Sequence, residues 1–334
     1  MKYQLAFVIP VYNIDEKLLE RCIDSIQDIV DIKYEIIIVD DGSTEEKSKK
    51  YNALVKKYSD CFLFHKENGG VSSARNYGLR CTEAEYVYFV DADDEIEPMA
   101  FSQEILKETI DICFSDISIK NSNGEMLWKA FSKEGEVAIE DVLKRMSMDG
   151  KINGPYGKII RCDFLKQNDI FYPEDMIHAE DGMFLVKMLS YMPKMHYFCV
   201  NSYYYNYSEA ETGLLRVLSH PDSIIKALKL FHEKINEMIL SFVEKDEICE
   251  ILYNEEKKYI KGLLNIAAEL ALVYKLKGNN MNLISESAMT SDKVVLQKLT
   301  GVSKLRYLLL RDKRYVLIYI YGCIRKIYLT IKGN

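Results

Sequence analysis

The sequence lacks the features that mark several common protein classes. It has eight cysteines and five histidines but no CxxC pair and no Cys/His cluster. A disulfide scaffold and a zinc site at ligand spacing are therefore not expected. We expect the cysteines to be reduced and to fill the core. They are Cys22, Cys61, Cys81, Cys113, Cys162, Cys199, Cys249 and Cys323.

A basic surplus and long apolar runs are also missing. Lys and Arg number 44 against 51 Asp and Glu, and this net charge of −7 argues against a protein that coats nucleic acid. Only one lysine precedes the short apolar run Leu5–Pro10, which fits neither a signal peptide nor a transmembrane span. We therefore expect a cytoplasmic protein.

The remaining composition suits a large core. Among 334 residues, 48% are apolar and 28% charged, which excludes disorder and leaves room for one large domain or two ordinary ones. The first hundred residues alternate apolar runs of strand length with segments of helical period, which is typical of βαβ units and a mostly parallel sheet. Strands are expected at 5–10, 34–40, 61–65 and 86–90, and a helix at 72–80.

Polar residues follow three of these expected strands directly. Pro10–Asn13 ends the first, Asp40–Ser43 ends the second and Asp91–Asp93 ends the fourth. Ligands of open parallel sheets bind beyond the carboxyl ends of the strands, so the three segments predict one site.

Two of these segments suggest particular chemistry. Asp91 and Asp93 flank Ala92, so both carboxylates can lean toward one Mg²⁺ or Mn²⁺, which would hold phosphate oxygens. The alternative is an acidic cluster on a solvated turn. In Asp40–Ser43, a carboxylate at the strand end, Asp41 or Asp40, can accept a ring N–H from a base, and Gly42 permits close approach of a ligand. Asp-Gly is also a frequent turn dipeptide.

Five segments, in this order, resemble the signature of glycosyltransferase family 2. They are Phe7–Asn13 (FVIPVYN), Ile38–Thr44 (IVDDGST), Asn68–Gly78 (NGGVSSARNYG), Phe89–Asp94 (FVDADD) and Glu180–Asp181 (ED). The resemblance covers about residues 1–210. It implies an α/β GT-A fold, which is Rossmann-like with a mostly parallel sheet flanked by helices, followed here by a C-terminal helical region. It also implies a nucleotide-sugar donor, a divalent metal and inversion at the anomeric carbon.

Carried over residue by residue, the resemblance implies that Asp93 is the metal ligand and that Asp91 contacts the donor sugar or ribose. The role of Asp94 stays open. Arg75 would face the nucleotide; the alternative is a helix-surface arginine, but the glycines before its helix favour an anion nearby. The residues implied to bind the nucleotide sugar are Pro10, Tyr12, Asn13, Asp40, Asp41, Arg75, Asp91, Ala92 and Asp93.

An inverting transfer also needs a carboxylate that takes the acceptor proton. The family places it in a Glu-Asp pair before a helix, so the resemblance makes Asp181 the candidate catalytic base. Glu180 and Asp181 could instead cap the helix that follows, and both roles are compatible.

The acceptor side gives weaker signals. No Gln-x-x-Arg-Trp motif of processive synthases occurs, and Trp128 is the only tryptophan, so we expect one sugar per encounter. Gly157–Lys158 and Tyr203–Tyr207 resemble acceptor-side segments of capsule and lipooligosaccharide enzymes. The aromatic run is also compatible with sheet core.

Charge is concentrated at the end of the chain. Residues 304–334 carry eight basic residues and one acid, a charge of +7 that leaves −14 for residues 1–303. Apolar residues are interleaved, so this segment reads as a basic amphipathic anchor on an anionic membrane surface. The alternative is a terminal helix that packs on the domain with a solvated basic face.

These observations predict a GT-A catalytic domain at 1–215, with a nucleotide-sugar half at 1–98 and an acceptor half at 99–215. A helical extension (216–303) and the basic segment (304–334) follow. We expect an inverting, metal-dependent hexosyl- or N-acetylhexosaminyltransferase that uses Mn²⁺ or Mg²⁺.

The expected reaction moves a sugar from a UDP-sugar to a hydroxyl of a glycan or lipid-linked saccharide. We expect it to serve cell-surface polysaccharide synthesis on the inner face of the membrane. One alternative is a sugar-phosphate nucleotidyltransferase, which usually carries a Gly-rich, basic loop after the first strand. The other is a non-catalytic, membrane-bound assembly subunit.

Overall fold

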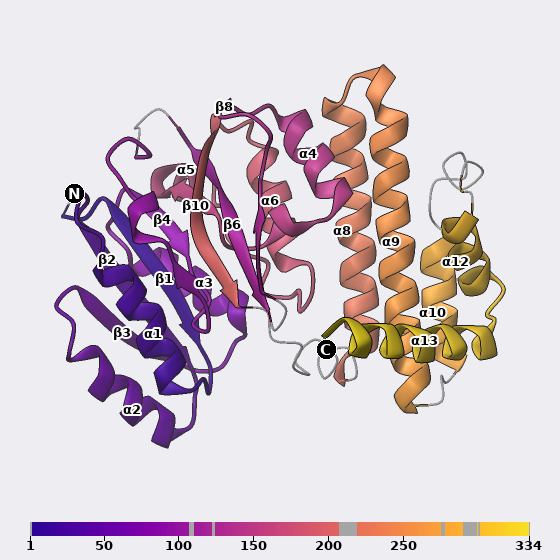
Figure 1. Cartoon of the computed structure of the whole chain (residues 1–334), viewed down its shortest axis with the longest axis horizontal. Coiled ribbons are helices and arrows are strands. Elements are labelled where there is room, and N and C mark those ends of the chain that lie inside the picture. Colours follow the sequence, from indigo (N-terminus) through magenta and orange to yellow (C-terminus); the bar gives the residue numbers. More distant parts are fainter. Residues whose placement is uncertain are drawn as a thin grey trace. The chain divides into compact units, whose positions relative to one another are not determined.

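The computed structural model describes residues 2–106, 110–121, 124–206, 219–274, 278–289, 299 and 301–333 (Figure 1). The chain divides into two compact units, and each is described by itself. The sheet unit comprises Met1–Ala138, Ile152–Asp175 and Met183–Tyr207. The helical unit comprises Ile139–Lys151, Met176–Gly182 and Ser208–Asn334. The boundary expected at residue 215 lies outside the described residues.

The sheet unit is built on one ten-stranded sheet. Its order is β3-β2-β1-β4-β9-β6-β10-β5, with β7 paired to β6 and β8 to β10. Strands β3, β2, β1 and β4 run parallel, whereas β9 is antiparallel to both β4 and β6. The strands are β1 (Leu5–Val11), β2 (Tyr34–Asp41), β3 (Cys61–Lys66), β4 (Tyr86–Phe89), β5 (Glu95–Ile96), β6 (Ile112–Asn121), β7 (Gly124–Trp128), β8 (Gly135–Glu136), β9 (Lys158–Arg161) and β10 (Met195–Asn206).

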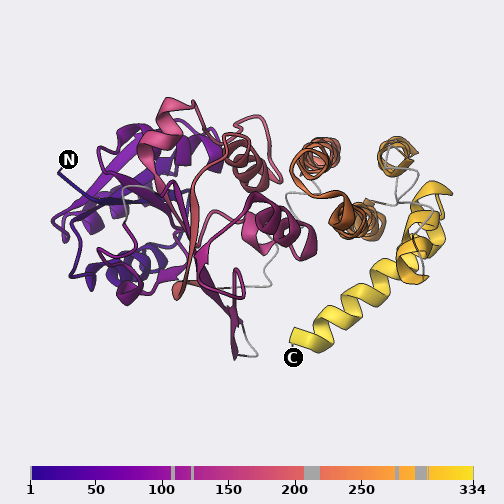
Figure 2. The same ribbon diagram turned by 90° about the horizontal axis from the view of Figure 1, so that it is seen from above.

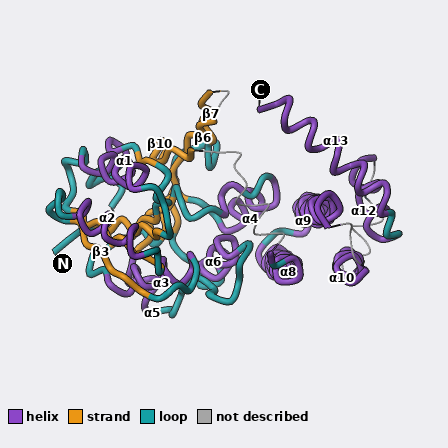
Figure 3. The backbone as a smooth tube through the Cα atoms, turned by 90° about the horizontal axis from the view of Figure 1, so that it is seen from below, coloured by secondary structure: helices purple, strands orange, loops and turns teal. Residues whose placement is uncertain are grey.

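Helices cover both faces of the parallel half, as the βαβ pattern predicts. Figure 3 shows α1 and α2 on one face and α3 and α5 on the other. The α1 helix begins where the Asp15 side chain accepts the Lys17 N–H, and it buries Leu19, Cys22, Ile23 and Ile26. The helices of this unit are α1 (Glu16–Gln27), α2 (Glu45–Val55), α3 (Val71–Cys81), α5 (Cys162–Gln167) and most of α6 (Glu180–Leu189).

The expected strands and helix agree with the structure to within a residue or two at each end. Ile36–Val39 in β2 is buried on both faces, which explains why this strand reads as a continuous apolar run. Helix α3 lies unusually close to β1 because Gly78 has no side chain there. A Cβ at Gly78 would lie 2.4 Å from Val8 Cγ1. The predicted α/β fold with a mixed, mostly parallel sheet is confirmed.

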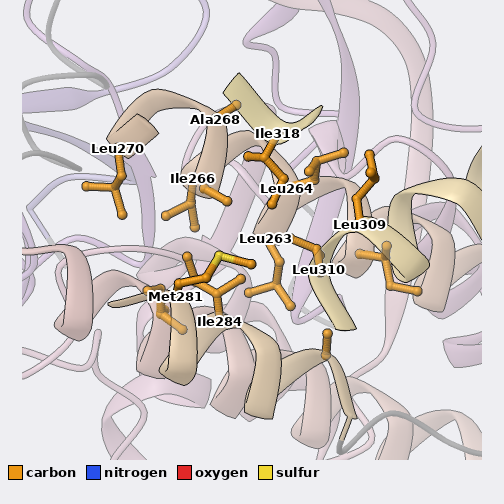
Figure 4. Packing of buried hydrophobic residues seen from close by; sticks show 14 of the residues in the cluster. Leu263, Leu264, Ile266, Ala268, Leu270, Met281, Ile284, Leu309, Leu310 and Ile318 are labelled. Atoms are coloured by element: carbon orange, nitrogen blue, oxygen red, sulfur yellow. The ribbon is translucent and has the colours of Figure 1, made fainter. Parts of the chain in front are cut away.

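The helical unit has its own apolar core. Figures 1 and 2 show α8 and α9 side by side, and Figure 4 shows apolar side chains of α9, α10, α12 and α13 packed together. Leu263, Leu264, Leu310 and Ile318 are fully buried there. The helices are α4 (Ile139–Met148), α8 (Pro221–Phe242), α9 (Lys245–Tyr274), α10 (Gly278–Met289), α12 (Gly301–Arg311) and α13 (Tyr315–Gly333). Among the described residues, every helix is too short or too polar to cross a membrane.

The cysteines are all free thiols, as the sequence predicts. Four are buried, and Cys81 and Cys323 are half-buried. The expectation that all eight fill the core is wrong for Cys199 and Cys249, which are exposed. Cys199 follows the buried Phe198 in β10, and Cys249 lies between half-buried Ile248 and exposed Glu250, so an apolar residue type alone does not fix burial.

A buried ionic cluster joins α8 to α9. His232 lies 3.3 Å from Glu255 through Nδ1 and 3.3 Å from Glu256 through Nε2. Its ring stacks on Tyr259 with centroids 3.9 Å apart. Burial would lower the pKa of His232, but the two carboxylates outweigh it and raise the pKa from 6.5 to about 9. The imidazolium is therefore favoured in the folded chain.

This cluster predicts a pH-dependent stability. The folded pKa of His232 lies above its unfolded value, so its contribution is complete below pH 6.5 and is lost as pH rises through about 9. At 1.4 kcal/mol per pKa unit the loss is roughly 3 kcal/mol. We expect urea unfolding to show this decline, and His232→Gln to flatten it. His220→Gln, at an exposed histidine in the same unit, is the control, and an equal effect of both variants would contradict the assignment.

Candidate active site

The carboxyl ends of β1 and β2 are tied together by Asn13. Its backbone N–H donates to Ser43 Oγ at 2.8 Å, and its Oδ1 accepts the Thr44 N–H at 2.9 Å. Asn13 has a left-handed backbone, with φ of 53°, which asparagine tolerates better than most residues. Its neighbour Tyr12 is 57% exposed, and Pro10 is half-buried. The first predicted segment therefore forms an open rim beside the second.

Asp40 is buried and engaged inside the protein. Its carboxylate accepts the Ser43 N–H at 2.9 Å and the Ser48 hydroxyl, and its Oδ2 lies 2.8 Å from His65 Nδ1. Burial would raise the pKa of Asp40, but these hydrogen bonds outweigh it and lower the pKa. Asp40 therefore fixes the turn after β2 as an ionised carboxylate.

Asp41 binds the start of α3. Its Oδ1 accepts Lys66 Nζ at 2.6 Å and the Gly69 N–H at 3.0 Å, and its Oδ2 accepts the Gly70 N–H at 2.7 Å. The sequence predicts an anion near these glycines, and in the structure Asp41 supplies one. Gly42 is required here, because a Cβ would lie 2.8 Å from the Asn68 nitrogen and its φ is 77°.

Sequence reasoning missed His65 and Lys66, the partners of these two carboxylates. In the parallel ladder of β2 and β3, Asp40 is aligned with His65 and Asp41 with Lys66. These partners could be found only from the register in which β2 pairs with β3, and the sequence alone does not give that register.

Arg75 links α3 to the end of β4. Its Nη2 lies 2.8 Å from Asp91 Oδ1, and its guanidinium lies 5.2 Å from the centre of the Tyr172 ring. Arg75 is only 3% exposed, so the interpretation as a helix-surface arginine is wrong. Burial beside one carboxylate holds the guanidinium in a fixed position at the strand end.

Asp94 is the buried member of the acidic segment. Its carboxylate accepts the Tyr203 hydroxyl at 2.7 Å and the Asn206 N–H at 2.7 Å. The same tyrosine hydroxyl accepts the Asp91 N–H at 3.1 Å. Burial, and next the charge of Asp91, raise the pKa of Asp94 to about 8. Tyr203 therefore anchors the backbone of the acidic segment to β10.

Asp93 differs because its side chain is exposed. Its backbone oxygen accepts Arg21 Nη2 at 2.8 Å and Asn206 Nδ2 at 3.0 Å. Partial loss of water around the carboxyl, and then the nearby Asp91 charge, raise the pKa of Asp93. The backbone of Asp93 is therefore held in place, while its carboxylate stays accessible to solvent.

Asp91 and Asp93 suit a small divalent cation that arrives with phosphate groups. Both offer hard oxygen ligands. Of the two oxygens of Asp91, Oδ1 is the one that accepts from Arg75. The described part of the chain holds no group of three Asp, Glu, His or Cys residues arranged for a metal. Mg²⁺ is commonly bound by one or two carboxylates together with substrate phosphates, so this donor set fits such an ion.

Asp181 lies in the first turn of α6, which begins at Glu180. The Glu-Asp pair is thus inside the helix rather than before it, and Glu180 is buried whereas Asp181 is half-buried. One turn later, Phe184 stacks on Tyr172 with ring centroids 3.9 Å apart and meets Phe89 edge-on. These rings fix the helix that carries Asp181, whose role as base stays a prediction.

The acceptor-side segments are largely internal. Lys158 is buried and donates from Nζ to the backbone oxygens of Gly154 and Tyr156 at 2.6 and 3.1 Å. Tyr203 is fully buried in β10, as the sheet-core interpretation predicts. Tyr207 lies outside the described residues. Tyr204 donates its hydroxyl to Glu97 at 2.7 Å.

Comparison with known proteins identifies the sheet unit. Residues 6–132 match the family model "Glycosyl transferase family 2". Poly(ribitol-phosphate) beta-N-acetylglucosaminyltransferase TarS of Staphylococcus aureus is 29% identical over 263 residues, which are 75% of this chain and 44% of that protein. Poly(ribitol-phosphate) beta-glucosyltransferase of Bacillus spizizenii is 32% identical over 213 residues, which are 60% of this chain and 32% of that protein. The chain thus spans less than half the length of these relatives.

The fold has a solved counterpart. The crystal structure of S. aureus TarS 1–349 in complex with UDP-GlcNAc matches 98% of this chain and 92% of that chain, with a TM-score of 0.67 and 23% identity. At this identity the match establishes the GT-A fold. It agrees with the α/β architecture derived above from strand order.

The Tyr203 anchor can be tested by removing one oxygen. Tyr203→Phe leaves buried Asp94 without its hydroxyl donor and the Asp91 N–H without its acceptor, so we expect a loss of about 2 kcal/mol in the free energy of unfolding. Tyr204→Phe is the matched control, since the Tyr204 hydroxyl donates to Glu97 at a more accessible position of the same strand. Urea denaturation measures both, and equal losses would contradict the anchoring role.

Proposed function

We propose that this chain is a glycosyltransferase of family 2, because residues 6–132 match the model of that family, and from that premise we infer its reaction. The chain transfers a hexosyl or N-acetylhexosaminyl group from a UDP-sugar to a hydroxyl of a glycan or lipid-linked saccharide, with inversion. The observation that carries the proposal is the edge beyond β4, where exposed Asp93 lies close in sequence to half-buried Asp91, which is paired with buried Arg75.

The donor would lie along the ends of β1, β2 and β4. Pro10, Tyr12 and Asn13 provide the open rim for the nucleoside, and Asp41 offers a carboxylate to a base N–H. Tyr12 supports this role because an exposed ring at a strand end can cover a planar base. Relatives whose names specify N-acetylglucosamine and glucose support a hexose or N-acetylhexosamine donor.

Arg75, Asp91 and Asp93 would handle the charge of the diphosphate. Asp93 is the proposed ligand of Mn²⁺ or Mg²⁺, and Asp91 the proposed contact to sugar or ribose. Either ion, when bound, neutralises the negative charge that develops on the departing diphosphate. The chain's own part is to hold Asp91 against Arg75 and to keep the Asp93 carboxylate accessible.

Asp181 is the proposed base. The acceptor oxygen forms a bond to the anomeric carbon, the bond from that carbon to the diphosphate oxygen breaks, and the acceptor proton passes to the Asp181 carboxylate. Glu180 is buried in the same turn, whereas Asp181 is half-buried. The family match favours this transfer over nucleotidyl transfer, because Pro10–Asn13 occupies the place of a basic, Gly-rich loop.

The acceptor suggests a location. A lipid-linked saccharide is confined to a membrane, so we place the enzyme on the cytoplasmic face of the cell membrane. Residues 304–334, with their charge of +7, are the proposed contact.

The base is tested by Asp181→Asn. We expect sugar transfer to fall about 1,000-fold while the affinity for UDP changes less than about twofold, because the amide keeps the shape but takes no proton. Asp175→Asn, at an exposed carboxylate nearby in the sequence, should retain activity. Transfer is followed with a panel of UDP-sugars and a soluble saccharide acceptor, and full activity of Asp181→Asn would remove it as base.

The metal site is tested by binding rather than turnover. Asp93→Asn should weaken UDP binding about tenfold in the presence of Mn²⁺ and leave UDP binding in chelator unchanged, because only the carboxylate holds the ion. Asp31→Asn, at an exposed loop carboxylate, is the control for a simple change of charge. Isothermal titration calorimetry measures the UDP affinity of both variants. If the unmodified chain binds UDP equally well with and without Mn²⁺, the proposed metal site is wrong.

A further inference from the structure

The last helix of the helical unit has apolar residues on two opposite faces. One face packs on α9, where Ile318 is fully buried and a Cβ at Gly322 would lie 3.2 Å from the Ala268 oxygen. Arg325 forms an ion pair with Glu269 on the same side. Figures 1 and 3 agree that α13 crosses α9 rather than running along it. The helix is therefore anchored by one side only.

The opposite face of α13 is apolar and exposed. Val316, Ile320 and Ile324 recur every fourth residue, which places them in one stripe, and they are exposed by 72%, 44% and 61%. Side chains beside the stripe on α13 widen this surface, and α12 carries two further exposed apolar side chains. We call the whole set the C-terminal apolar face: Val302, Leu305, Val316, Leu317, Tyr319, Ile320 and Ile324.

This arrangement differs from both interpretations of the sequence. The terminal helix packs on its unit, as the alternative to an anchor expects, but its free face is apolar instead of basic. A helix that is apolar on all sides is stable in a protein only when each side is covered. Within the described residues, nothing covers the C-terminal apolar face.

The charged residues of α12 and of the turn after it are basic with one exception. Lys304 and Arg314 are exposed, whereas the single acid of the segment, Asp312, is paired with Arg311. Lys313 donates to Asn282 at the turn that joins α12 to α13. A surface that combines exposed cations with protruding aliphatic side chains matches a lipid layer with anionic headgroups and an apolar interior.

We propose that the C-terminal apolar face inserts into an anionic lipid surface, with α13 lying in the plane of that surface and Ile318 and Gly322 holding it to α9. The proposal rests on the proposed function only in its choice of a membrane-bound acceptor. In this proposal the exposed stripe of α13 provides most of the binding to lipid. Cations such as Arg314 add an electrostatic attraction to anionic headgroups, which weakens as the salt concentration rises.

The test uses the full chain and vesicles of phosphatidylcholine, alone or with an equal part of phosphatidylglycerol. We expect flotation with the anionic vesicles, weaker flotation with the neutral ones, and a decrease with added salt. The triple variant Val316→Ser/Ile320→Ser/Ile324→Ser should lower the bound fraction at least about tenfold, because three exposed aliphatic groups are lost. Its fold is checked by circular dichroism.

The matched control is Leu230→Ser/Leu240→Ser, which removes exposed leucines from α8 of the same unit and should bind like the unmodified chain. Flotation of the triple variant equal to that of the unmodified chain overturns the proposal, as does absence of flotation in the unmodified chain. If sedimentation instead shows that the unmodified chain is a dimer and the triple variant a monomer, a second copy covers the face and the lipid assignment is wrong.

A measurement of sugar transfer distinguishes a failure of this proposal from a failure of the proposed function. With a soluble acceptor and no vesicles, the triple variant should transfer sugar as well as the unmodified chain. Flotation without any transfer by the unmodified chain would refute the glycosyltransferase activity and leave lipid binding intact.

Discussion

The carboxylate of Asp41 is the interaction on which the candidate site depends. It binds Lys66 and the Gly69 and Gly70 N–H groups, and so joins the end of β2 to the start of α3. Helix α3 carries Arg75, which holds Asp91 beyond β4. A helix N-terminus attracts negative charge, so this contact is favourable for both partners. Removing it would release the helix that aligns two strand ends.

Three carboxyl groups lie close together in the segment that follows β4. Asp91, Asp93 and Asp94 follow one strand, and loss of water on burial, followed by the charge of Asp91, raises the pKa values of Asp93 and Asp94. The protein manages this repulsion by burying Asp94 against Tyr203 and by pairing Asp91 with Arg75. Asp93 is exposed and Asp91 is half-buried, so a ligand of positive charge at these two carboxylates relieves the remaining repulsion.

The positions of the first four strands along the chain and of the acidic segment could be predicted, because both are local in the sequence. Ile36–Val39 is a continuous apolar run, and Asp91–Asp93 interrupts another. The partners of these groups could not be predicted, because Tyr203 lies 109 residues from Asp94 and Lys66 meets Asp41 only through strand register. The exposed face of α13 was missed for a related reason: composition does not reveal which side of an apolar helix is covered.

Gly78 has a consequence for how a donor would be received. Because α3 packs against Val8 of β1 without a side chain between them, close packing leaves the helix little room to shift on the strand. The separation between Arg75 and the strand ends is therefore fixed before any ligand arrives. Such preorganisation means that little conformational entropy is lost when a diphosphate enters, so more of the binding energy remains available to the reaction.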